Sequence, residues 1–596
     1  MLPGWYNCKP EPAPILFAAF DVETQGLGGA LILGTTTDPE GRSRAYKGNP
    51  DTICGLMFDE MWKRPFLRGS SKREPSKVIW YAHNAQYDWR YLLKYALKQS
   101  DWHVEVSMRT DTDIYQVMVK RGSGRRIETL IMRDSYALFP ATLKDFSKQF
   151  APDHAKMDFD HEHDTIDPDN PDHIAYAIRD TEALRLSLIA YDAAVRTDYG
   201  VGLRATAAST ALAGWERTLD DDVIYYGSDG EIEAFARQAY FGGLVFLTST
   251  DAHSGAVTYD INSSYPHQMR THGVPGGKCA RTTRLQFEAP AFYRVTVTAP
   301  DDLTIPILPC RDARGGVLWP RGTFETTVSN AELLFSMDRG YALDRVHEGY
   351  QWEHIEYPFS AFVDRAEAIR QAARKTPRET VAKVMQNSVY GKFGSQRVRS
   401  RMIILDPGED VGEGWTPWDE EGQLWIEKET VEDMQVKVEW AAWITAQARL
   451  HLLRTAYAMG VDQVLYGDTD SLTVKAGTPA PDCGAAYGQW KEEKIWIVFR
   501  PIAPKVYAGC VAAPEGPRLM GAAKGLAKKA MRGIHWRRLM EGHRLRIKTD
   551  TLGSLLCSLK KEEIIAARVL KRKSTDILKS RNYEREGHKI RPRKIA

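Results

Sequence analysis

Two apolar runs rich in β-branched residues enclose a pair of acids in the stretch Val464-Leu465-Tyr466-Gly467-Asp468-Thr469-Asp470-Ser471-Leu472-Thr473-Val474. Apolar runs on either side of a short polar turn predict a β-hairpin, here with Gly467-Asp468 at the turn. Acids held between apolar strands need a compensating cation, and carboxylate oxygens are good ligands for Mg²⁺. The stretch therefore predicts either a metal-binding hairpin or an ordinary acidic loop, and the choice depends on what accompanies it in the chain.

Length and composition indicate a multidomain globular chain. It has 596 residues, of which 43% are hydrophobic, whereas single cores stop growing at about 250–300 residues. No apolar run is long enough to span a membrane, and the N-terminus lacks the pattern of a signal peptide. The 7 Cys are scattered and form no CxxC pair, which argues against a zinc ribbon or a disulfide framework and favours a cytoplasmic location.

The net charge of +2 hides a basic C-terminal segment, residues 560–596, in which Lys and Arg greatly outnumber Asp and Glu. Such an asymmetry suggests a polyanionic partner, although a solvated basic tail has the same composition.

A second pair of acids ends the first apolar stretch, Ile15-Leu16-Phe17-Ala18-Ala19-Phe20-Asp21-Val22-Glu23-Thr24. This stretch predicts a buried strand, and Asp21 and Glu23 lie on one face of it because they are two residues apart. Neighbouring like charges destabilise a sheet unless a cation lies between them. The pair therefore predicts a second cation site.

Two further polar clusters follow along the chain. His83 and Asn84 come at the end of a predicted strand, and Asp88 falls at the start of a helix, where it is either an N-cap or a further acid of the site. Tyr176 and Asp180 are four residues apart in a helical pattern, so they share a helix face, as a plain surface pair or as part of a site.

Together, Asp21-x-Glu23, Asp88 and Tyr176-xxx-Asp180 resemble the three exonuclease motifs of the DEDD nucleases, in the subclass with a Tyr in the third motif. The resemblance implies a ribonuclease H-like α/β domain that removes nucleotides in the 3′→5′ direction, with two divalent ions held by the four carboxylates. It also implies that Tyr176 orients the attacking water. The residues implied to contact the substrate strand or its scissile phosphate are Thr24, His83, Asn84, Tyr87, Ser135 and Lys156.

Two more stretches lie between these motifs and the acidic hairpin. Asp260 ends a predicted strand in Val257-Thr258-Tyr259-Asp260-Ile261-Asn262-Ser263-Ser264-Tyr265-Pro266. Lys383, Asn387 and Tyr390 form one stripe of a predicted helix, which is not a core pattern, and a single cation there suits a phosphate. Upstream, Tyr240-Phe241-Gly242-Gly243 is either a plain turn or a place where the backbone approaches a ligand closely.

The stretches that begin at Asp260, at Lys383 and at Tyr466 resemble motifs A, B and C of the family B DNA polymerases, in the family's order. In motifs A and C the resemblance implies that Asp260, Ile261 and Asp470 hold two Mg²⁺ ions, or Mn²⁺, with Asp468 as a supporting acid of the catalytic site.

The resemblance also implies roles for the residues that surround these acids. Lys383 neutralises triphosphate charge, Tyr390 packs beside the incoming base and Tyr265 excludes a ribose 2′-OH. The remaining nucleotide contacts are Asn387 and Ser264. The implied contacts with template and primer are Tyr240, Gly242, Gly243, Ser263, Thr469, Lys505 and Tyr507.

Within this family the chain is similar to the compact, protein-primed polymerases of bacteriophages and linear plasmids, because it is short and leaves room for two insertions. The expected order is an exonuclease domain (1–197), the first part of a right-hand palm (198–270), a first insertion (271–363), fingers (364–394), a second insertion (395–437), the rest of the palm (438–535), and a thumb with the basic C-terminus (536–596). The insertions resemble those that contact a terminal protein and close around DNA.

Some residues depart from the family or stay undecided. Glu379 stands where the phage relatives have a second basic residue one turn before Lys383, and Arg374, Lys375 or Arg378 could replace it. In the second insertion, Arg397, Arg399 and Arg401 alternate on one face of a predicted strand, ahead of the acidic segment 406–433. Basic residues at helical spacing predict a thumb that grips phosphates: Arg537, Arg538, Arg544, Arg546 and Lys548.

The sequence thus predicts a monomeric, proofreading DNA polymerase with strand displacement. Its expected partners are template and primer DNA, dNTPs and a terminal protein that primes synthesis, with no membrane, in the cytoplasm of a host cell if it is encoded by a phage. Two alternatives stay open: the same polymerase starting chains without primer or terminal protein, as a primase does, and a non-catalytic DNA-binding relative.

Overall fold

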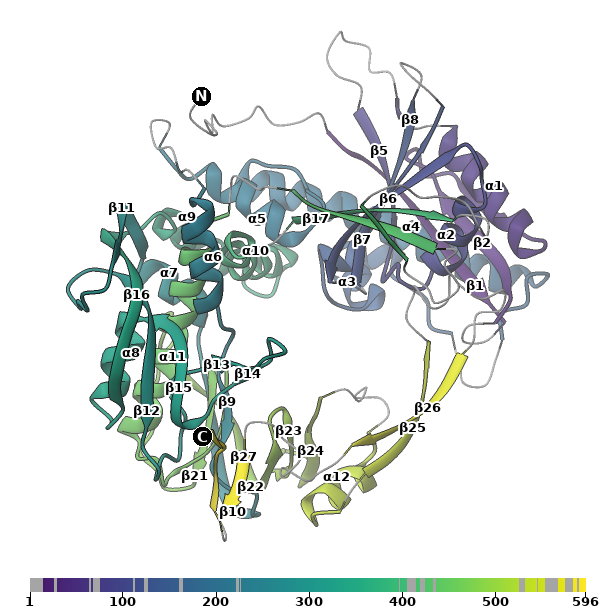
Figure 1. Cartoon of the computed structure of the whole chain (residues 1–596). Helices are drawn as coiled ribbons and strands as arrows, with labels where there is room; N and C mark the ends of the chain where they lie inside the picture. Colours follow the sequence, from purple (N-terminus) through teal and green to yellow (C-terminus); the bar gives the residue numbers. More distant parts are fainter. Residues whose placement is uncertain are drawn as a thin grey trace.

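The structure is a computed structural model that describes residues 14–25, 29–63, 66–67, 76–110, 113–122, 127–159, 165–220, 225, 227–395, 397–404, 414–417, 424–431, 436–524, 531–543, 545–552, 566–573, 583–586 and 589–595. Figure 1 shows an N-terminal lobe, purple to blue, at the upper right and a larger teal and green lobe at the left.

The N-terminal lobe is built on an 11-stranded sheet in which β1 (Leu16–Thr24) pairs in parallel with β5 (Ser76–Ala82), and β5 with β8 (Glu128–Asp134). Antiparallel neighbours complete this part of the sheet: β2 (Leu31–Thr37), β3 (Ser43–Tyr46), β6 (Trp102–Thr110) and β7 (Asp113–Arg121). The helices of the lobe are α1 (Pro50–Trp62), α2 (Trp89–Leu97), α3 (Leu143–Phe150) and α4 (Pro171–Tyr199).

Strand alternation decides which helix each residue of β1 meets. Phe17 and Ala19 pack in one core with Leu184 and Leu188 of α4, whereas Phe20 and Val22 pack on the opposite side of the sheet with α1 and α2. Because side chains two residues apart lie on one face, the residues that follow Ala19 at this spacing also face α4.

The segment expected to form the second insertion (395–437) extends this N-terminal sheet. Its strand β17 (Arg397–Ile404) pairs antiparallel with β6, with Val398 opposite Met108, and on its other side with β19 (Leu424–Val431), which in turn pairs with β18 (Trp415–Pro417). The predicted strand over the three alternating arginines is therefore present. Their side chains and most of the acidic segment 406–433 lie outside the described residues.

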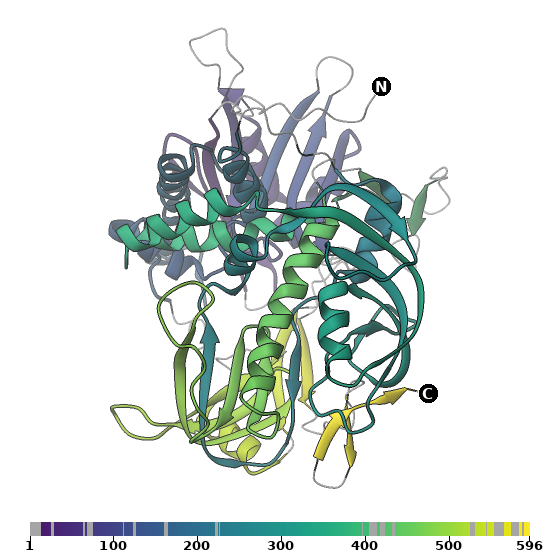
Figure 2. The same ribbon diagram turned by 90° about the vertical axis from the view of Figure 1, so that its left-hand side faces the viewer.

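The larger lobe contains a 7-stranded sheet of order β24-β23-β22-β10-β21-β20-β9. Its strands are β9 (Val245–Leu247), β10 (His253–Ile261), β20 (Val464–Asp468), β21 (Ser471–Lys475), β22 (Trp490–Ala503), β23 (Val506–Val511) and β24 (Arg518–Ala523). The long helix α11 (Val438–Ala458), green in Figure 2, packs Leu450 and Leu453 against Val464 and Leu472 of this sheet. The predicted strands around Asp260 and the acidic hairpin are thus at its centre.

Three helices lie between the two lobes, and one of them, α10, carries the predicted motif B stripe. They are α5 (Ala207–Glu216), α9 (Ser360–Ala372) and α10 (Pro377–Phe393). Val381 and Met385 of α10 share a core with Tyr191 and Tyr199 of α4, so the N-terminal lobe supports this helix directly.

The segment expected to form the first insertion (271–363) supplies four strands of a 5-stranded sheet of order β11-β16-β12-β15-β29, with α8 (Asn330–Met337) at the end of β15. Its strands are β11 (Val274–Thr282), β12 (Ala291–Ala299), β15 (Arg321–Ser329), β16 (Ala342–Glu356) and β29 (Lys594–Ile595). Because β29 comes from the end of the chain, the C-terminal segment returns to the first insertion and pairs in parallel with β15.

The predicted run of helical spacing in the thumb is wrong in part. Arg537 and Arg538 lie on α12 (Gly533–Met540), but Arg546 and Lys548 lie on the strand β25 (Leu545–Leu552), which pairs with β26 (Ala566–Lys573). The segment alternates apolar and polar residues with period two, and its hydrogen bonds to β26 favour the strand. Arg544 lies outside the described residues. Within the described part of the chain, no helix combines the length and hydropathy that a membrane crossing needs.

Candidate active sites

The four acids of the N-terminal lobe converge at the end of β1. Asp21 and Glu23 face α4, where Asp180 is one turn beyond Tyr176, and carboxylate oxygens of these three acids lie within 4.8 Å of one another. Asp88 joins them by accepting a hydrogen bond from the backbone N–H of Val22, at 3.1 Å. It occupies the N-cap position of α2, but its carboxylate makes no capping bond, so the N-cap alternative does not explain its side chain.

Mutual repulsion in a buried setting makes this cluster fit cations. Burial, and then the neighbouring carboxylates, hold the pKa values of Asp21 and Asp88 well above their usual range, and burial with Asp180 raises the pKa of Glu23 to about 7. Ionising all four acids together is therefore unfavourable unless positive charge is added. Carboxylates alone form the oxygen donor set that Mg²⁺ and Mn²⁺ accept.

One cation of the chain already lies at this cluster. Lys156 forms an ion pair with Asp180 and donates to the hydroxyl of Tyr176 at 3.0 Å. Burial alone would lower the pKa of Lys156, but Asp180 and Tyr176 outweigh it and raise the pKa. Tyr176 is 3% exposed, so the plain surface pair that the sequence left open is excluded.

The predicted strand contacts surround the acids in two groups. Thr24 and Tyr87 are joined by a hydrogen bond between their hydroxyls, and Asn84 is exposed beside them on the loop after β5. His83 contacts the Ser135 hydroxyl and the Ala141 carbonyl, both at 2.8 Å, and burial lowers its pKa to about 4. Ser135 is fully buried, so it can act on a nucleic acid only through His83.

In the larger lobe, Asp260 and Asp470 are brought together by strand pairing. Asp260 of β10 is opposite Ser471 of β21, and the N–H of Ile261 donates to the carbonyl of Asp470 at 2.8 Å. The hairpin from the acidic stretch is present, but its turn is Thr469-Asp470, and Gly467 lies within β20.

Two close contacts explain why the turn is displaced by two residues. A Cβ on Gly467 would lie 2.3 Å from the ring of Phe246, so glycine is needed inside the strand. Thr469 takes the positive φ of 61° instead, and its N–H donates to the carbonyl of Leu244 at 2.8 Å. A Cβ on Gly243 would lie 2.6 Å from Thr469, so the loop after Tyr240 touches the turn that carries Asp470.

Lysines neutralise the acids of this second cluster. Lys491 of β22 pairs with Asp260 at 2.9 Å, and Lys505 pairs with Asp468 at 2.7 Å. Burial, then repulsion by Asp260 and Asp468, raises the pKa of Asp470 to about 6. This acid therefore also favours added positive charge. Sequence reasoning missed Lys491, because only the register of β10 on β22 places it opposite Asp260.

The predicted primer contacts Lys505 and Tyr507 are close to the same turn. The N–H of Lys505 donates to the Tyr466 hydroxyl at 2.8 Å, and the rings of Tyr466 and Tyr507 lie 5.5 Å apart.

Backbone φ angles are positive at several of the predicted DNA contacts. Among the described residues other than glycine, positive values occur at Asn84, Ser263, Lys375, Thr469 and Lys505. Four of these were predicted as DNA contacts, and backbone strain of this kind clusters at functional sites.

Two of the predicted nucleotide contacts, Tyr265 and Tyr390, lie near Asp470, and burial together with the charge of this acid raises the pKa of both hydroxyls. Tyr265 and Tyr390 stack with ring centroids 4.5 Å apart, while Lys383 and Asn387 are exposed on α10. The Ser264 hydroxyl is buried and has no hydrogen-bond partner among the described residues.

Arg374, Lys375 and Arg378 were the candidates for a second basic residue that contacts the triphosphate, and the structure argues against one of them. Arg378 forms an ion pair with Asp198 of α4, which engages its guanidinium. A residue that the sequence did not single out, Arg370 of α9, donates to the Ser263 hydroxyl at 2.8 Å. Helical periodicity alone could not have identified Arg370, since its partner belongs to motif A.

A buried ion pair joins the first insertion to the loop after Tyr240. Arg449 of α11 pairs with Glu332 of α8 at 2.7 Å, and both side chains are at most 2% exposed. The same guanidinium donates to the carbonyls of Phe241 and Gly242, at 2.6 and 3.0 Å. Arg449 of α11 thus holds the backbone of Phe241 and Gly242, and Glu332 of the first insertion neutralises this arginine.

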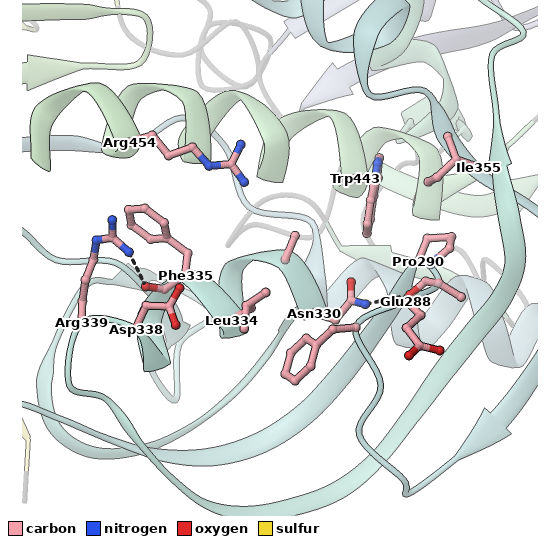
Figure 3. A pocket seen from close by; sticks show the side chains of 13 residues that line it. Glu288, Pro290, Asn330, Leu334, Phe335, Asp338, Arg339, Ile355, Trp443 and Arg454 are labelled. Atoms are coloured by element: carbon pink, nitrogen blue, oxygen red, sulfur yellow. Dashed lines mark hydrogen bonds between the residues drawn. The ribbon is translucent and has the colours of Figure 1, made fainter. Parts of the chain in front are cut away.

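A cavity of about 480 Å³ lies apart from both acid clusters (Figure 3). Trp443 and Arg454 reach it from α11, and Leu334 and Phe335 reach it from α8. None of the acids assigned above lines it.

The chain is similar to known proteins over much of its length. Residues 70–169 and 170–442 match the family model described as DNA polymerase type B, organellar and viral. A probable DNA polymerase of Neurospora intermedia is 25% identical over 375 residues, which cover 58% of this chain and 38% of that protein. The chain thus spans less than half the length of this fungal relative. The DNA polymerase of Bacillus phage phi29 is 24% identical over 483 residues, covering 72% of this chain and 77% of the phage protein.

Solved structures bear out the fold. An orthorhombic crystal form of phi29 DNA polymerase superposes with a TM-score of 0.70 at 20% identity, covering 87% of this chain and 93% of that one. The phi29 polymerase complexed with primer-template DNA and incoming nucleotide substrates gives 0.68 at 18% identity, with the same coverage. The predicted fold, a ribonuclease H-like exonuclease domain followed by a right-hand polymerase with insertions, is therefore confirmed.

Proposed function

Because the chain belongs to the type B DNA polymerases of organelles and viruses, we propose that it extends a primer 3′-OH with dNTPs on a DNA template and removes 3′ nucleotides at a second centre. The observation that carries this proposal is the presence of two separate acid clusters on two sheets, one at the end of β1 and one at the β20–β21 turn.

In the polymerase centre, Asp260, Asp470 and Ile261 would hold two Mg²⁺ ions and Asp468 would support them. Ions bound there would lower the pKa of the primer 3′-OH and would neutralise charge on the triphosphate and the leaving pyrophosphate. Lys383 and Arg370 contribute positive charge on the triphosphate side, as phosphoryl transfer requires. Arg370 joins Arg374 and Lys375 as a candidate for the second basic residue, whereas the guanidinium of Arg378 is engaged by Asp198.

Other residues of this centre orient the two substrates. The stacked pair Tyr265 and Tyr390 would pack beside the incoming base and sugar, and Lys505 with Tyr507 would hold the primer end. Asn387 and Ser264 complete the nucleotide contacts, while Tyr240, Gly242, Gly243, Ser263 and Thr469 lie along the strand path.

In the exonuclease centre, Asp21, Glu23, Asp88 and Asp180 would hold the second pair of ions. Tyr176 orients water toward the scissile phosphate, and Lys156 holds that hydroxyl by donating to it. Thr24 and Tyr87 bind the frayed 3′ end, Tyr87 by stacking on a base.

The finer parts of the proposal concern partners. The domain boundaries are those set out from the sequence. A terminal protein serves as the primer, and the second insertion supports strand displacement. The enzyme acts as a monomer in the cytoplasm of the host. Two features support these parts of the proposal: segments 271–363 and 395–437 contribute strands to sheets other than the one that holds Asp260 and Asp470, and the DNA polymerase of Bacillus phage phi29 is similar over 72% of the chain.

Incubation with dNTPs and Mg²⁺ tests the proposal in three reactions: a primed template, an unprimed circle, and the unprimed circle with a candidate terminal protein. Extension of the primed template is expected, and its loss in Asp470→Asn excludes a non-catalytic relative. Products on the bare circle would contradict protein priming and establish the primase-like alternative.

A further inference from the structure

A short loop of the larger lobe, residues 483–489, is fastened to motif A. The side-chain amide of Asn262 donates to the Gly484 carbonyl at 2.7 Å, and its N–H donates to the Gln489 carbonyl at 2.9 Å. The N–H of Gly488 returns a bond to the Asn262 carbonyl at 2.8 Å. Three bonds to one residue fix the loop relative to the strand that carries Asp260.

From this loop, Tyr487 reaches the two helices of the fingers. Arg370 of α9 donates to its hydroxyl at 2.9 Å, and the hydroxyl donates to the side-chain carbonyl of Gln386, on α10, at 2.8 Å. Gln386 is fully buried, and its amide donates to the Ser263 hydroxyl at 3.4 Å, which is also the second acceptor of Arg370, at 2.8 Å. The four side chains close a ring of hydrogen bonds between palm and fingers.

Within this cycle of hydrogen bonds, the positive charge of Arg370 is not balanced by an acid of the described residues. Both of its acceptors are neutral hydroxyls, no carboxylate of the described residues pairs with it, and its Nε is buried without a partner there. Its guanidinium lies 5.5 Å from the centroid of the Tyr487 ring. Arg270 also lies against the aromatic ring of Tyr487, but it forms ion pairs with Glu367 and Asp364. Of the two arginines, Arg370 is therefore the one available to bind an anion.

A tyrosine hydroxyl suits this position because it accepts and donates at once. It accepts from Arg370 on one helix and donates to Gln386 on the other, while the loop holds its ring against motif A. The position of the guanidinium is therefore set relative to the metal-binding strand instead of by α9 alone.

We propose that Tyr487 and Gln386 are positioning residues that hold Arg370 where it meets the triphosphate of the incoming dNTP. The proposal rests on the proposed polymerase function. Neither residue touches the nucleotide. Both act through Arg370, so their loss weakens nucleotide binding more than it slows the chemical step.

The test is single-nucleotide incorporation on a primed template with Tyr487→Phe, which removes one hydroxyl and keeps the ring. The KM for dNTP is expected to rise about fivefold, roughly the factor that one ordinary hydrogen bond represents, with kcat within about twofold of the wild type. Degradation of a single strand is expected to be unchanged. The matched control is Tyr457→Phe, which loses a bond of the same kind to the Ile305 carbonyl, at 3.0 Å, away from this ring.

A second variant separates positioning from simple packing. Gln386→Leu and the double variant Tyr487→Phe/Gln386→Leu are expected to raise the KM by the same factor as Tyr487→Phe alone, since all three break one ring. Three outcomes would overturn the proposal. The KM of the double variant could rise by the product of the two single increases, the KM of Tyr487→Phe could be unchanged, or the KM of Tyr457→Phe could rise as much as that of Tyr487→Phe. A wild-type chain that incorporates no nucleotide would overturn the polymerase function as well, so the two failures are distinguishable.

Discussion

At the scale of single residues, both acid clusters consist of carboxylates that their surroundings disfavour as anions. Burial is the first cause in each, and repulsion by neighbouring acids adds to it at Asp21, Glu23 and Asp470. A fold tolerates buried, mutually repelling carboxylates when a bound cation compensates their charge. The clusters therefore destabilise the folded chain without metal, and bound metal stabilises it.

The pH dependence of stability follows from Glu23, whose pKa rises from 4.5 to about 7 on folding. Between these values the folded chain keeps a proton that the unfolded chain has released, so the free energy of unfolding falls as pH rises through this window. The loss is on the order of 3 kcal/mol at about 1.4 kcal/mol per unit.

Thermal melts of the metal-free chain at pH 5 and pH 8 measure this effect. The melting temperature is expected to fall more between the two pH values in the wild type than in Glu23→Gln, and Mg²⁺ is expected to raise it more at pH 8 than at pH 5. Equal pH dependence in the two chains would contradict the prediction.

The contact between Gly243 and Thr469 gives a second prediction at this scale. Gly243→Ala places a Cβ 2.6 Å from Thr469, so the turn that carries Asp470 must shift. Primer extension is expected to slow by about 10–100-fold, the cost of small misplacements in an active site. Gly230→Ala is the matched control, because a Cβ there meets no atom within 4 Å and the residue belongs to neither centre. An equal loss in both variants would argue against the contact.

At the scale of elements, the buried pair of Arg449 and Glu332 ties α11 to α8 and to the loop after Tyr240. Breaking one partner of such a pair leaves an uncompensated buried charge. Glu332→Gln is therefore expected to lower the free energy of unfolding by about 3 kcal/mol.

Denaturant unfolding checks this loss against an exposed pair. Asp169→Asn removes the partner of Lys47 at the surface, where an ion pair contributes about 0–1 kcal/mol. A loss in Glu332→Gln no larger than in Asp169→Asn would show that the buried pair does not hold the loop.

Motifs within one helix or strand could be predicted from the sequence, whereas contacts between distant elements could not. The strands that end in Asp21 and Asp260 and the helix stripe of Lys383, Asn387 and Tyr390 could be predicted, because each motif lies within one element. Contacts that depend on register between distant elements could not be. Lys491 opposite Asp260 and Arg370 beside Ser263 belong to this class. The hairpin turn was misplaced because glycine was assigned to the turn, whereas Phe246 requires it in the strand.

At the scale of the whole molecule, the second insertion joins the N-terminal sheet by pairing β17 with β6. The sequence predicted this strand but not its partner, since β6 lies about 290 residues earlier. The insertion therefore connects the two lobes through backbone hydrogen bonds, in addition to the packing of α10 on α4.

Hydrogen exchange tests the joined sheet. Ser400→Pro removes a backbone donor within β17, opposite Val106, and is expected to reduce the protection of amides at 104–108. Thr416→Pro is the control, because β18 pairs only with β19 among the described strands. Unchanged protection in Ser400→Pro would contradict the pairing.

We propose that one chain carries two independent acid centres, one for synthesis and one for 3′→5′ degradation. The most direct test measures both reactions on one 5′-labelled primer-template with Asp470→Asn and with Asp21→Asn. Asp470→Asn is expected to lose extension and keep degradation without dNTPs, and Asp21→Asn is expected to do the reverse. Loss of both reactions in either variant, or of neither, would contradict the claim.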